Sequence, residues 1–209
     1  MARLHSSVQQ HGLARFASLT VLALALLGTG GVFVSASAPI VPGKCIKSSL
    51  ASLGYTNAVS LTNGLMLHWK NVSPTSINFA LEAKAASKAS KGWLSLGFSK
   101  DGKMTGADAV IGNLAGAKPI NAYFMKSIAL GDVKPTTKFT VTNAKMDVNP
   151  QRTIVKFTRS GSAGTVPVKY GAKNLLLWAF SADGKKALGP LNHSPSNRGV
   201  VSVNLGCKV

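Results

Sequence analysis

GWLSLGFSKDGKMTGADAVIG, at residues 92–112, is the stretch of sequence that decides the fold. Its first segment alternates, so that the large side chains of Leu94, Leu96 and Phe98 share one face of a predicted strand. Asp101-Gly102 is a turn signal, and a second apolar alternation begins at Ala107. The stretch therefore predicts a strand, a polar turn and a second strand.

Short alternating segments of the same kind fill most of the chain after residue 64. Further strands are expected at Leu65–Trp69, Ser76–Ala83, Pro119–Lys126, Thr137–Asn143, Thr153–Arg159, Asn174–Ser181 and Gly199–Leu205. Gly54–Asn63 is expected to be a loop, and the polar region Lys134–Asp147 an edge strand or a long loop. Many short strands separated by turn signals predict an all-β chain, an antiparallel sandwich or barrel.

The N-terminal residues have the composition of a secretory signal peptide. Two arginines precede an apolar run at residues 16–34, and small residues follow it, which favours cleavage after Ala36. The alternative is an uncleaved transmembrane anchor. No later apolar run approaches the ~20 residues that span a bilayer. We therefore expect a signal peptide at 1–36, a linker at 37–44 and one domain at 45–207, secreted to the extracellular space (the apoplast or cell wall) without stable membrane insertion.

Two cysteines, Cys45 and Cys207, lie near the two ends of the expected mature chain. In an oxidising compartment such a pair most simply forms one disulfide, which would close nearly the whole domain into a loop. The alternative is two free, buried thiols. A zinc site is not favoured, because no Cys-x-x-Cys motif or histidine cluster accompanies the pair.

The chain is strongly basic, with a formal net charge of +18 and only six acidic residues. In a secreted protein this charge favours an anionic partner such as a cell-wall or matrix polymer, or a membrane surface, over nucleic acid. The alternative is a solvated surface that keeps the protein soluble. No Gly-x-Ser-x-Gly elbow, Walker loop or suggestive spacing of carboxylates is present. We therefore predict that the chain is not an enzyme.

Met104 and His193 are the candidate site residues. Met104 lies in a glycine-flanked loop, where a thioether gains little from water, and His193 lies in a loop that contains Pro190 and Pro195. A thioether and an imidazole are a known axial pair for haem iron. Because no Cys-x-x-Cys-His motif occurs, the haem would be a non-covalent haem b.

Residues 92–112, and above all the Gly-x-Met-x-Gly-Ala-Asp segment that begins at Gly102, resemble the core of a DOMON domain. Leu67-His68-Trp69 and the His193 loop also fit that family. DOMON domains are β-sandwiches that bind haem or sugars, and similar members include the cytochrome domain of fungal cellobiose dehydrogenase and the auxin-responsive secreted cytochromes of plants. The resemblance implies a β-sandwich in which Met104 and His193 ligate haem b. It also implies single-electron transfer with a separate redox partner.

Several accessory roles follow from this resemblance as expectations. The candidates to line a haem pocket are Leu94, Leu96, Phe98, Val110, Leu177 and Phe180, of which only some can do so because the rest must fill the core. The cations expected near the haem propionates are Lys100, Lys103 and Arg198, and Asn192 or Ser194 would orient the His193 ring. The alternative is a haem-free module that binds a carbohydrate or a phenolic ligand through Trp69, Trp93, Trp178 or Tyr123.

Overall fold

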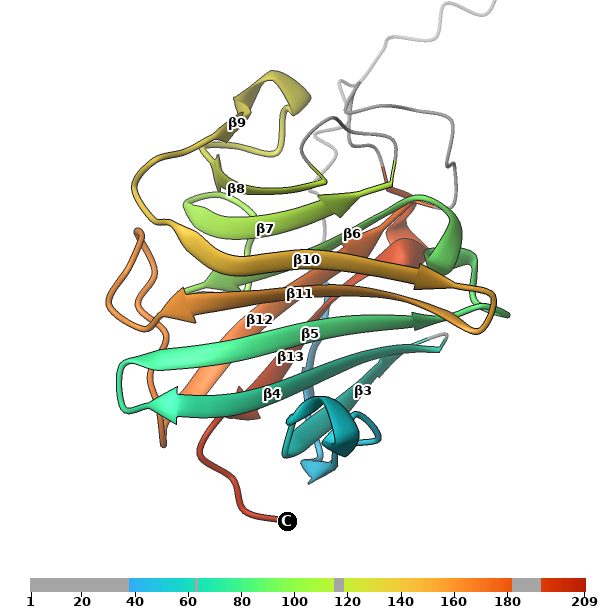
Figure 1. Cartoon of the computed structure of the whole chain (residues 1–209). Coiled ribbons are helices and arrows are strands. Elements are labelled where there is room, and N and C mark those ends of the chain that lie inside the picture. The colour runs from blue at the N-terminus through green and yellow to red at the C-terminus, as the bar shows by residue number, and fades with distance from the viewer. Residues whose placement is uncertain (1–37, 63, 115–118, 182–192) are drawn as a thin grey trace, which may run out of the picture. The chain divides into compact units, whose positions relative to one another are not determined.

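The computed structural model describes residues 38–62, 64–114, 119–181 and 193–209 (Figure 1). The predicted signal peptide at 1–36 lies outside the described residues. The strands are β1 (Ile40–Pro42), β2 (Ile46–Lys47), β3 (Asn57–Thr62), β4 (Leu65–Ser73), β5 (Ser76–Lys84), β6 (Trp93–Ser99), β7 (Ala107–Asn113), β8 (Ile120–Met125), β9 (Val133–Pro135), β10 (Val141–Asn149), β11 (Arg152–Ser160), β12 (Lys173–Phe180) and β13 (Arg198–Asn204). Short 3₁₀ helices occur at η1 (Ala51–Leu53), η2 (Lys88–Lys91), η3 (Leu130–Asp132) and η4 (Pro195–Asn197).

Within the described residues the strands form two sheets that pack face to face. One is seven-stranded, in the order β1-β13-β12-β6-β7-β8-β9, and the other is six-stranded, in the order β10-β11-β5-β4-β3-β2. Neighbouring strands are antiparallel except for β1, which pairs with β13 in parallel. The predicted all-β antiparallel β-sandwich is therefore confirmed.

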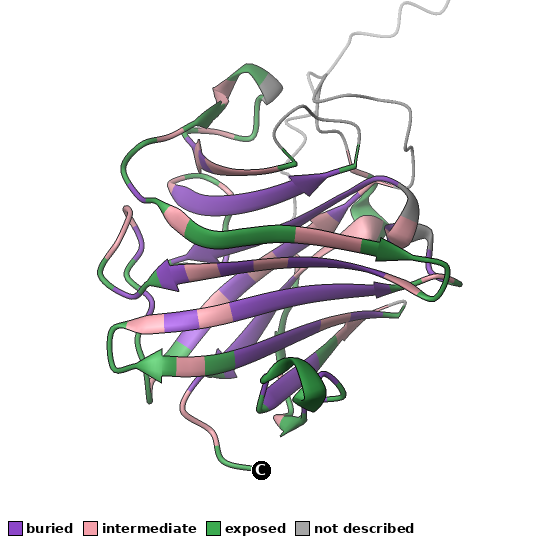
Figure 2. Cartoon of the chain, in the orientation of Figure 1, coloured by how far each residue is buried: buried purple, intermediate pink, exposed green. Residues whose placement is uncertain are grey.

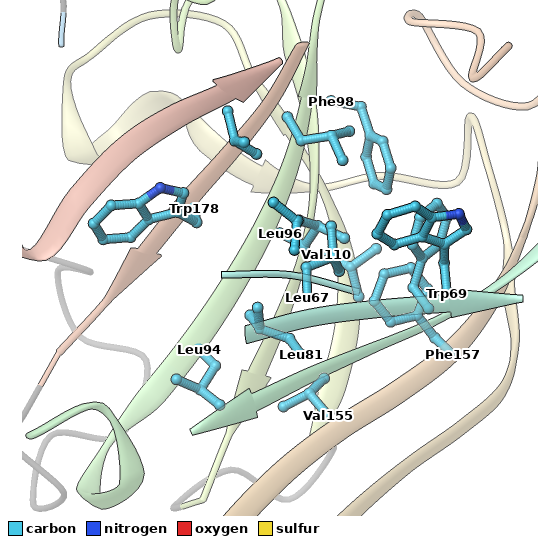
Figure 3. Packing of buried hydrophobic residues seen from close by; sticks show 14 of the residues in the cluster. Leu67, Trp69, Leu81, Leu94, Leu96, Phe98, Val110, Val155, Phe157 and Trp178 are labelled. Atoms are coloured by element: carbon cyan, nitrogen blue, oxygen red, sulfur yellow. The ribbon is translucent and has the colours of Figure 1, made fainter. Parts of the chain in front are cut away.

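The main core lies between the two sheets and is built by the alternation seen in the sequence (Figures 2 and 3). Leu94, Leu96 and Phe98 of β6 point into it, where Phe79 contacts both Phe98 and Phe157 with ring centroids 5.6 and 5.5 Å apart. Aromatic side chains bury the largest apolar areas, so this cluster supplies much of the driving force for packing the sheets together.

Most of the predicted strands are present, and two predictions are wrong. Gly54–Asn63 was expected to be a loop but contains β3, whose polar residues are tolerated because β3 pairs with β4 on one side and contacts only the two-residue β2 on the other. The strand expected at Thr137–Asn143 begins later, as β10 at Val141. β10 is the edge strand of the six-stranded sheet, as was expected for the polar region. An edge strand buries little, so its apolar period is weak.

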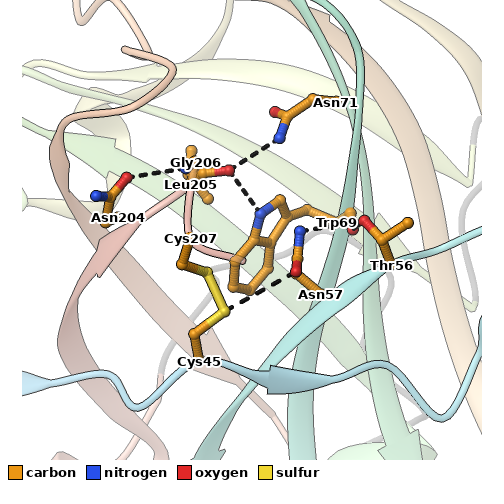
Figure 4. Close-up of a disulfide and its surroundings, with 9 residues drawn as sticks. All are labelled: Cys45, Thr56, Asn57, Trp69, Asn71, Asn204, Leu205, Gly206 and Cys207. Atoms are coloured by element: carbon orange, nitrogen blue, oxygen red, sulfur yellow. Dashed lines mark hydrogen bonds between the residues drawn. A yellow bond between two sulfur atoms is a disulfide. The ribbon is translucent and has the colours of Figure 1, made fainter. Parts of the chain in front are cut away.

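Cys45 and Cys207 form the predicted disulfide, with their Cα atoms 6.6 Å apart (Figure 4). Two side chains of β4 hold the same end of the chain, because Trp69 Nε1 and Asn71 Nδ2 each donate to Leu205 O at 2.9 Å. Among the described residues no helix is long and apolar enough to cross a membrane.

Candidate functional site

A second apolar cluster lies on the outer face of the seven-stranded sheet, on the side away from the main core. Its buried members are Trp93, Ala107, Ala109, Ile111, Tyr123 and Met125, and Met104, Val133, Leu177 and Ala179 pack against them. The outer face of an antiparallel sandwich is commonly polar and solvated. Here β7 is buried along its whole length (Figure 2). The seven-stranded sheet therefore has apolar surfaces on both faces.

The middle of this outer face is made of small side chains. The strand register places Gly97 beside Ala109 and Leu177, and Ser95 beside Ala179. Because side chains alternate between faces, these residues point away from the main core. Ser95, Gly97, Ala109 and Ala179 form a floor of small side chains, with Leu177 beside Gly97 and Ile111 beside Ser95.

The loop that carries Met104 is shaped first by polar contacts within the turn. Ser99 Oγ accepts a hydrogen bond from Gly102 N at 3.0 Å and donates to Lys103 O at 2.8 Å. Asp101 Oδ1 accepts from Lys103 N at 2.9 Å. Gly102 has φ +81°, a left-handed conformation that glycine adopts without steric cost. The turn is thereby fixed immediately before Met104.

A second turn fixes the chain immediately after Met104. Met104 O accepts a hydrogen bond from Ala107 N at 3.1 Å, and Gly106 between them has φ +77°. Gly106 N donates to Met125 O at 2.7 Å, which ties the turn to β8. Both glycines that flank Met104 in the motif therefore occupy left-handed positions, and the partly buried thioether packs against the outer cluster.

The same loop folds back across the outer face of the sheet. A Cβ atom added to Gly102 would lie 3.3 Å from Ile40 Cδ1 and 3.5 Å from Val200 Cγ1, on β1 and β13. Met104 is thus carried by a loop that lies over the sheet at the Ser99 end of β6. An apolar side chain in this loop is buried against the sheet, which explains why it is not exposed to water.

His193 lies at the other end of the same face. Its ring contacts Trp93 edge-on, with centroids 6.2 Å apart and an interplanar angle of 62°. The Nδ1 atom is buried and has no hydrogen-bond partner among the described residues. Burial lowers the pKa of the His193 imidazole, and the charge of Arg198 lowers that pKa further. A lower pKa favours the neutral ring, whose free lone pair is the one that a metal uses.

The structure thus brings the two candidate ligands to one face. His193 contacts Trp93, the first residue of β6, and the Met104 loop is anchored by Ser99, the last residue of β6. The Met104 loop folds back over the sheet from the Ser99 end, so both side chains lie over the same face of the seven-stranded sheet.

Asp108, the acidic residue of the motif, points the other way, into the core. Its carboxylate pairs with Arg159 at 2.9 Å, both side chains are fully buried, and Oδ2 also accepts from Thr165 N and Val166 N. The Arg159 guanidinium lies 3.9 Å above the Phe98 ring. Asp108 therefore joins β7 to β11 and to the loop after β11. In the sequence, its place between Ala107 and Ala109 in an apolar segment is the signal that indicates this burial.

Five of the six candidate lining residues fill the core instead. Leu94, Leu96, Phe98, Val110 and Phe180 fill the core between the sheets, and Leu177 alone packs on the outer face with Met104. The large residues of each strand pack against the opposite sheet, which leaves the small residues on the outer face. Sequence alternation separates the large residues from the small ones. It does not show which of these two sets lies on the side of the candidate site.

The other expected residues divide in the same way. Trp69 and Trp178 belong to the main core, whereas Trp93 and Tyr123 belong to the outer cluster. Lys100 and Lys103 are exposed in the Met104 loop, and Arg198 is half-buried. Ser194 Oγ lies 2.9 Å from Ser196 Oγ, and Asn192 lies outside the described residues. In the part of the chain that the structure describes, no group of three or more His, Cys, Asp or Glu side chains is arranged to hold a metal.

Comparison with known proteins agrees with this architecture. A family model for the DOMON domain matches residues 61–180, which is more than half of the chain. The chain belongs to the DOMON family. The cytochrome domain of Myriococcum thermophilum cellobiose dehydrogenase is similar to this DOMON protein, with a TM-score of 0.55 and 15% sequence identity over 78% of this chain and 88% of that one.

The cytochrome b domain of pyranose dehydrogenase from Coprinopsis cinerea is also similar, with a TM-score of 0.49 and 15% identity over 69% of this DOMON chain and 78% of that one. No curated protein matched the sequence. At this level of identity the likeness to the Myriococcum domain establishes a shared fold, and the roles of individual residues rest on the contacts of this chain.

Proposed function

We propose that this DOMON protein is a secreted electron-transfer module that binds haem b, with Met104 and His193 as the axial ligands. The observation that carries the proposal is the placement of a thioether and an imidazole over the same apolar face of one sheet. In this proposal a flat apolar macrocycle would lie against that face, where Ser95, Gly97, Ala109 and Ala179 present small side chains. The cytochrome domains that share the fold support the same reading.

The residues present fit a haem group. His193 Nδ1 is a buried nitrogen without a hydrogen-bond partner among the described residues. Burying it in this way costs free energy unless a bound ligand contacts the ring. A thioether is a soft donor that favours ferrous iron, and imidazole is a good donor to both oxidation states. When bound, haem b supplies a reversible one-electron couple.

The chain's own contribution is to hold the donors and exclude water. Trp93 restricts the His193 ring by edge-on contact, and the two glycine turns set the position of Met104. The outer cluster keeps the site apolar. Lys100 and Lys103 are exposed beside Met104 and offer ammonium groups to the propionates. A fixed, dry environment reduces the structural change that accompanies a one-electron step.

In this proposal electrons pass to or from a separate redox partner, and the chain performs no substrate chemistry of its own. The Cys45–Cys207 disulfide supports an oxidising, extracellular location, to which the predicted signal peptide would deliver the chain. The redox partner would meet the protein after secretion.

The test is a visible absorption spectrum of the purified mature protein with haemin, recorded before and after dithionite. We expect a low-spin b-type spectrum that is lost or shifted in Met104→Leu and unchanged in Met66→Leu, a matched change on the outer face of β4. His193→Gly should lose the spectrum and recover it when imidazole is added. A folded wild-type protein, checked by circular dichroism, that takes up no haemin would refute the proposal.

The same face supports one second candidate function. Trp93 and Tyr123 both lie in the outer cluster, where an aromatic ring or a sugar ring could stack. If the protein is colourless, we expect a phenolic compound or a carbohydrate to change the fluorescence of Trp93 in a saturable way, and Trp93→Phe to abolish that change.

A further inference from the structure

Three segments that are distant in sequence meet at the end of the sandwich that carries the disulfide. The disulfide joins residues 44–47 to residues 204–208 through Cys45 and Cys207. Lys173, the first residue of β12, pairs with Asn204, and a Cβ atom added to Gly206 would lie 2.6 Å from Gly171 Cα. Residues 169–173 therefore lie against residues 204–208. Figure 4 shows the disulfide that joins the C-terminal segment to Cys45.

These three segments carry only positive side-chain charge. Their lysines are all exposed: Lys44, Lys47, Lys169, Lys173 and Lys208. The segments contain no Asp or Glu, and none of the five ammonium groups forms an ion pair with a residue that the structure describes. We call this surface the lysine end. Its charge is therefore not neutralised within the described part of the protein.

An exposed aromatic ring lies within the lysine end. Tyr170 is 50% exposed, next to Lys169. Asn174 holds the loop that carries both residues, because Lys169 N donates to its Oδ1 at 2.9 Å and its Nδ2 donates to Lys169 O and Ala172 O at 2.8 Å each. Gly171 has φ +74°, which closes the loop in a left-handed turn. Tyr170 is thus presented on a backbone that is already ordered.

We propose that the lysine end binds an anionic polysaccharide with a carboxylate on successive sugars. Exposed ammonium groups attract the carboxylates, and the Tyr170 ring offers a flat apolar surface to the face of a sugar ring. The disulfide and the Asn174 contacts hold the three segments in place, so binding costs little conformational entropy.

The composition of the surface favours this partner over the other polyanions. Lysine is depleted at protein–protein interfaces, which disfavours an acidic protein. The disulfide indicates an oxidising compartment, which disfavours an intracellular nucleic acid. This binding is independent of haem, so it is separable from the proposed electron transfer.

The probe is an oligogalacturonate of about ten sugars, titrated into the full mature protein by calorimetry at low salt and again at high salt. We expect saturable binding that weakens as salt rises, because the exposed charges are screened. Lys169→Gln/Lys173→Gln should weaken binding about fivefold to tenfold, since two exposed ion pairs are lost. Tyr170→Ala should weaken binding at both salt concentrations.

The matched control is Lys126→Gln/Lys134→Gln, which removes the same charge from exposed positions after β8 and on β9. This control should change the affinity less than about twofold, as expected for distant exposed charges. Equal weakening by the two double variants would mean a general charge attraction and would overturn the proposal. Tighter binding of a single-stranded oligonucleotide or an acidic protein than of oligogalacturonate would overturn the choice of partner.

Discussion

Single residues of the Gly-x-Met-x-Gly-Ala-Asp motif perform different tasks on opposite faces of one sheet. Gly102 and Gly106 allow left-handed turns, and Asp108 forms a buried ion pair with Arg159 in the core. Met104 and Ala107 pack on the outer face. Most of the motif therefore maintains the β6–β7 connection. A DOMON chain that kept the glycines and the aspartate but lacked the methionine would keep the loop and lose the thioether.

A second polar arrangement at the residue scale lies on the outer face of the six-stranded sheet. Ser48 Oγ lies 2.9 Å from His68 Nδ1, and His68 Nε2 lies 3.0 Å from Glu82 Oε2. Arg152 pairs with the other oxygen of Glu82 at 3.2 Å. The segment around Leu50 and Tyr55 covers this face, which is why His68 is fully buried. His68 is a structural residue here.

We expect Glu82→Gln to change how stability depends on pH. The hydrogen bond from His68, and then the Arg152 contacts, lower the pKa of Glu82 below 4.5, although burial opposes this shift. A carboxylate whose pKa is lower in the folded state stabilises the fold above its unfolded pKa, and this stabilisation is lost as the pH falls through the folded value. Wild type should therefore be more stable than Glu82→Gln near neutral pH, and the difference should shrink below pH 4.5.

Urea unfolding at a series of pH values measures this difference. Curves for the two proteins that stay parallel through the acid range would contradict the assigned role of Glu82.

At the scale of elements, the two sheets approach most closely where β7 crosses β11. Gly112 points into the core, and a Cβ atom added there would lie 2.4 Å from Val155 Cγ2 and 2.9 Å from Cγ1. We expect Gly112→Ala to lower the free energy of unfolding by about 1–3 kcal/mol, because added atoms overpack the core. Val155→Ala should relieve most of this added cost in the double variant, as measured by chemical denaturation.

Gly106→Ala is the matched control for this pair. An added Cβ atom meets nothing within 4 Å, but φ is +77°, so we expect a cost of about 1 kcal/mol from backbone strain alone. If Val155→Ala also restored the stability of Gly106→Ala, then the restored stability of Gly112→Ala would not be due to local packing against Val155.

The positions of strands were predictable from sequence where large apolar residues alternate along the strand and a neighbouring strand pairs with each of its two edges. β4, β5, β6 and β12 fit this description, and their alternation predicted their positions. β3 and β10 lie at or next to sheet edges, where packing imposes little pattern. The alternation of β6 also predicted its two faces. It did not predict which face carries Met104, because that depends on how the loop folds back over β13.

Residue type and loop context singled out Met104 and His193, and the family resemblance supplied their joint role as ligands. The floor of Ser95, Gly97, Ala109 and Ala179 brings together residues that are up to 84 positions apart in sequence. A single glycine or alanine in a strand carries little information. The floor becomes visible only when the register of β6, β7 and β12 is known.

At the scale of the whole molecule, the disulfide joins residues 162 positions apart. We expect Cys45→Ser/Cys207→Ser to lower the free energy of unfolding by about 3–5 kcal/mol, because the open unfolded chain gains conformational freedom. Denaturant unfolding without reductant measures the loss. Wild type treated with a reductant should match the double variant, and equal stability of oxidised wild type and the variant would refute this estimate.

The position of the bridge also determines how the protein responds to tension. Cys45 precedes every strand but β1, and Cys207 follows β13, the last strand. A force applied between residues 44 and 208 passes through the sulfur–sulfur bond and leaves the ladders of both sheets unstretched. A force applied from the N-terminal side detaches the three residues of β1. The disulfide at Cys45 then carries the force, so no further strand is detached. The sandwich is thus mechanically isolated from whatever holds its two ends.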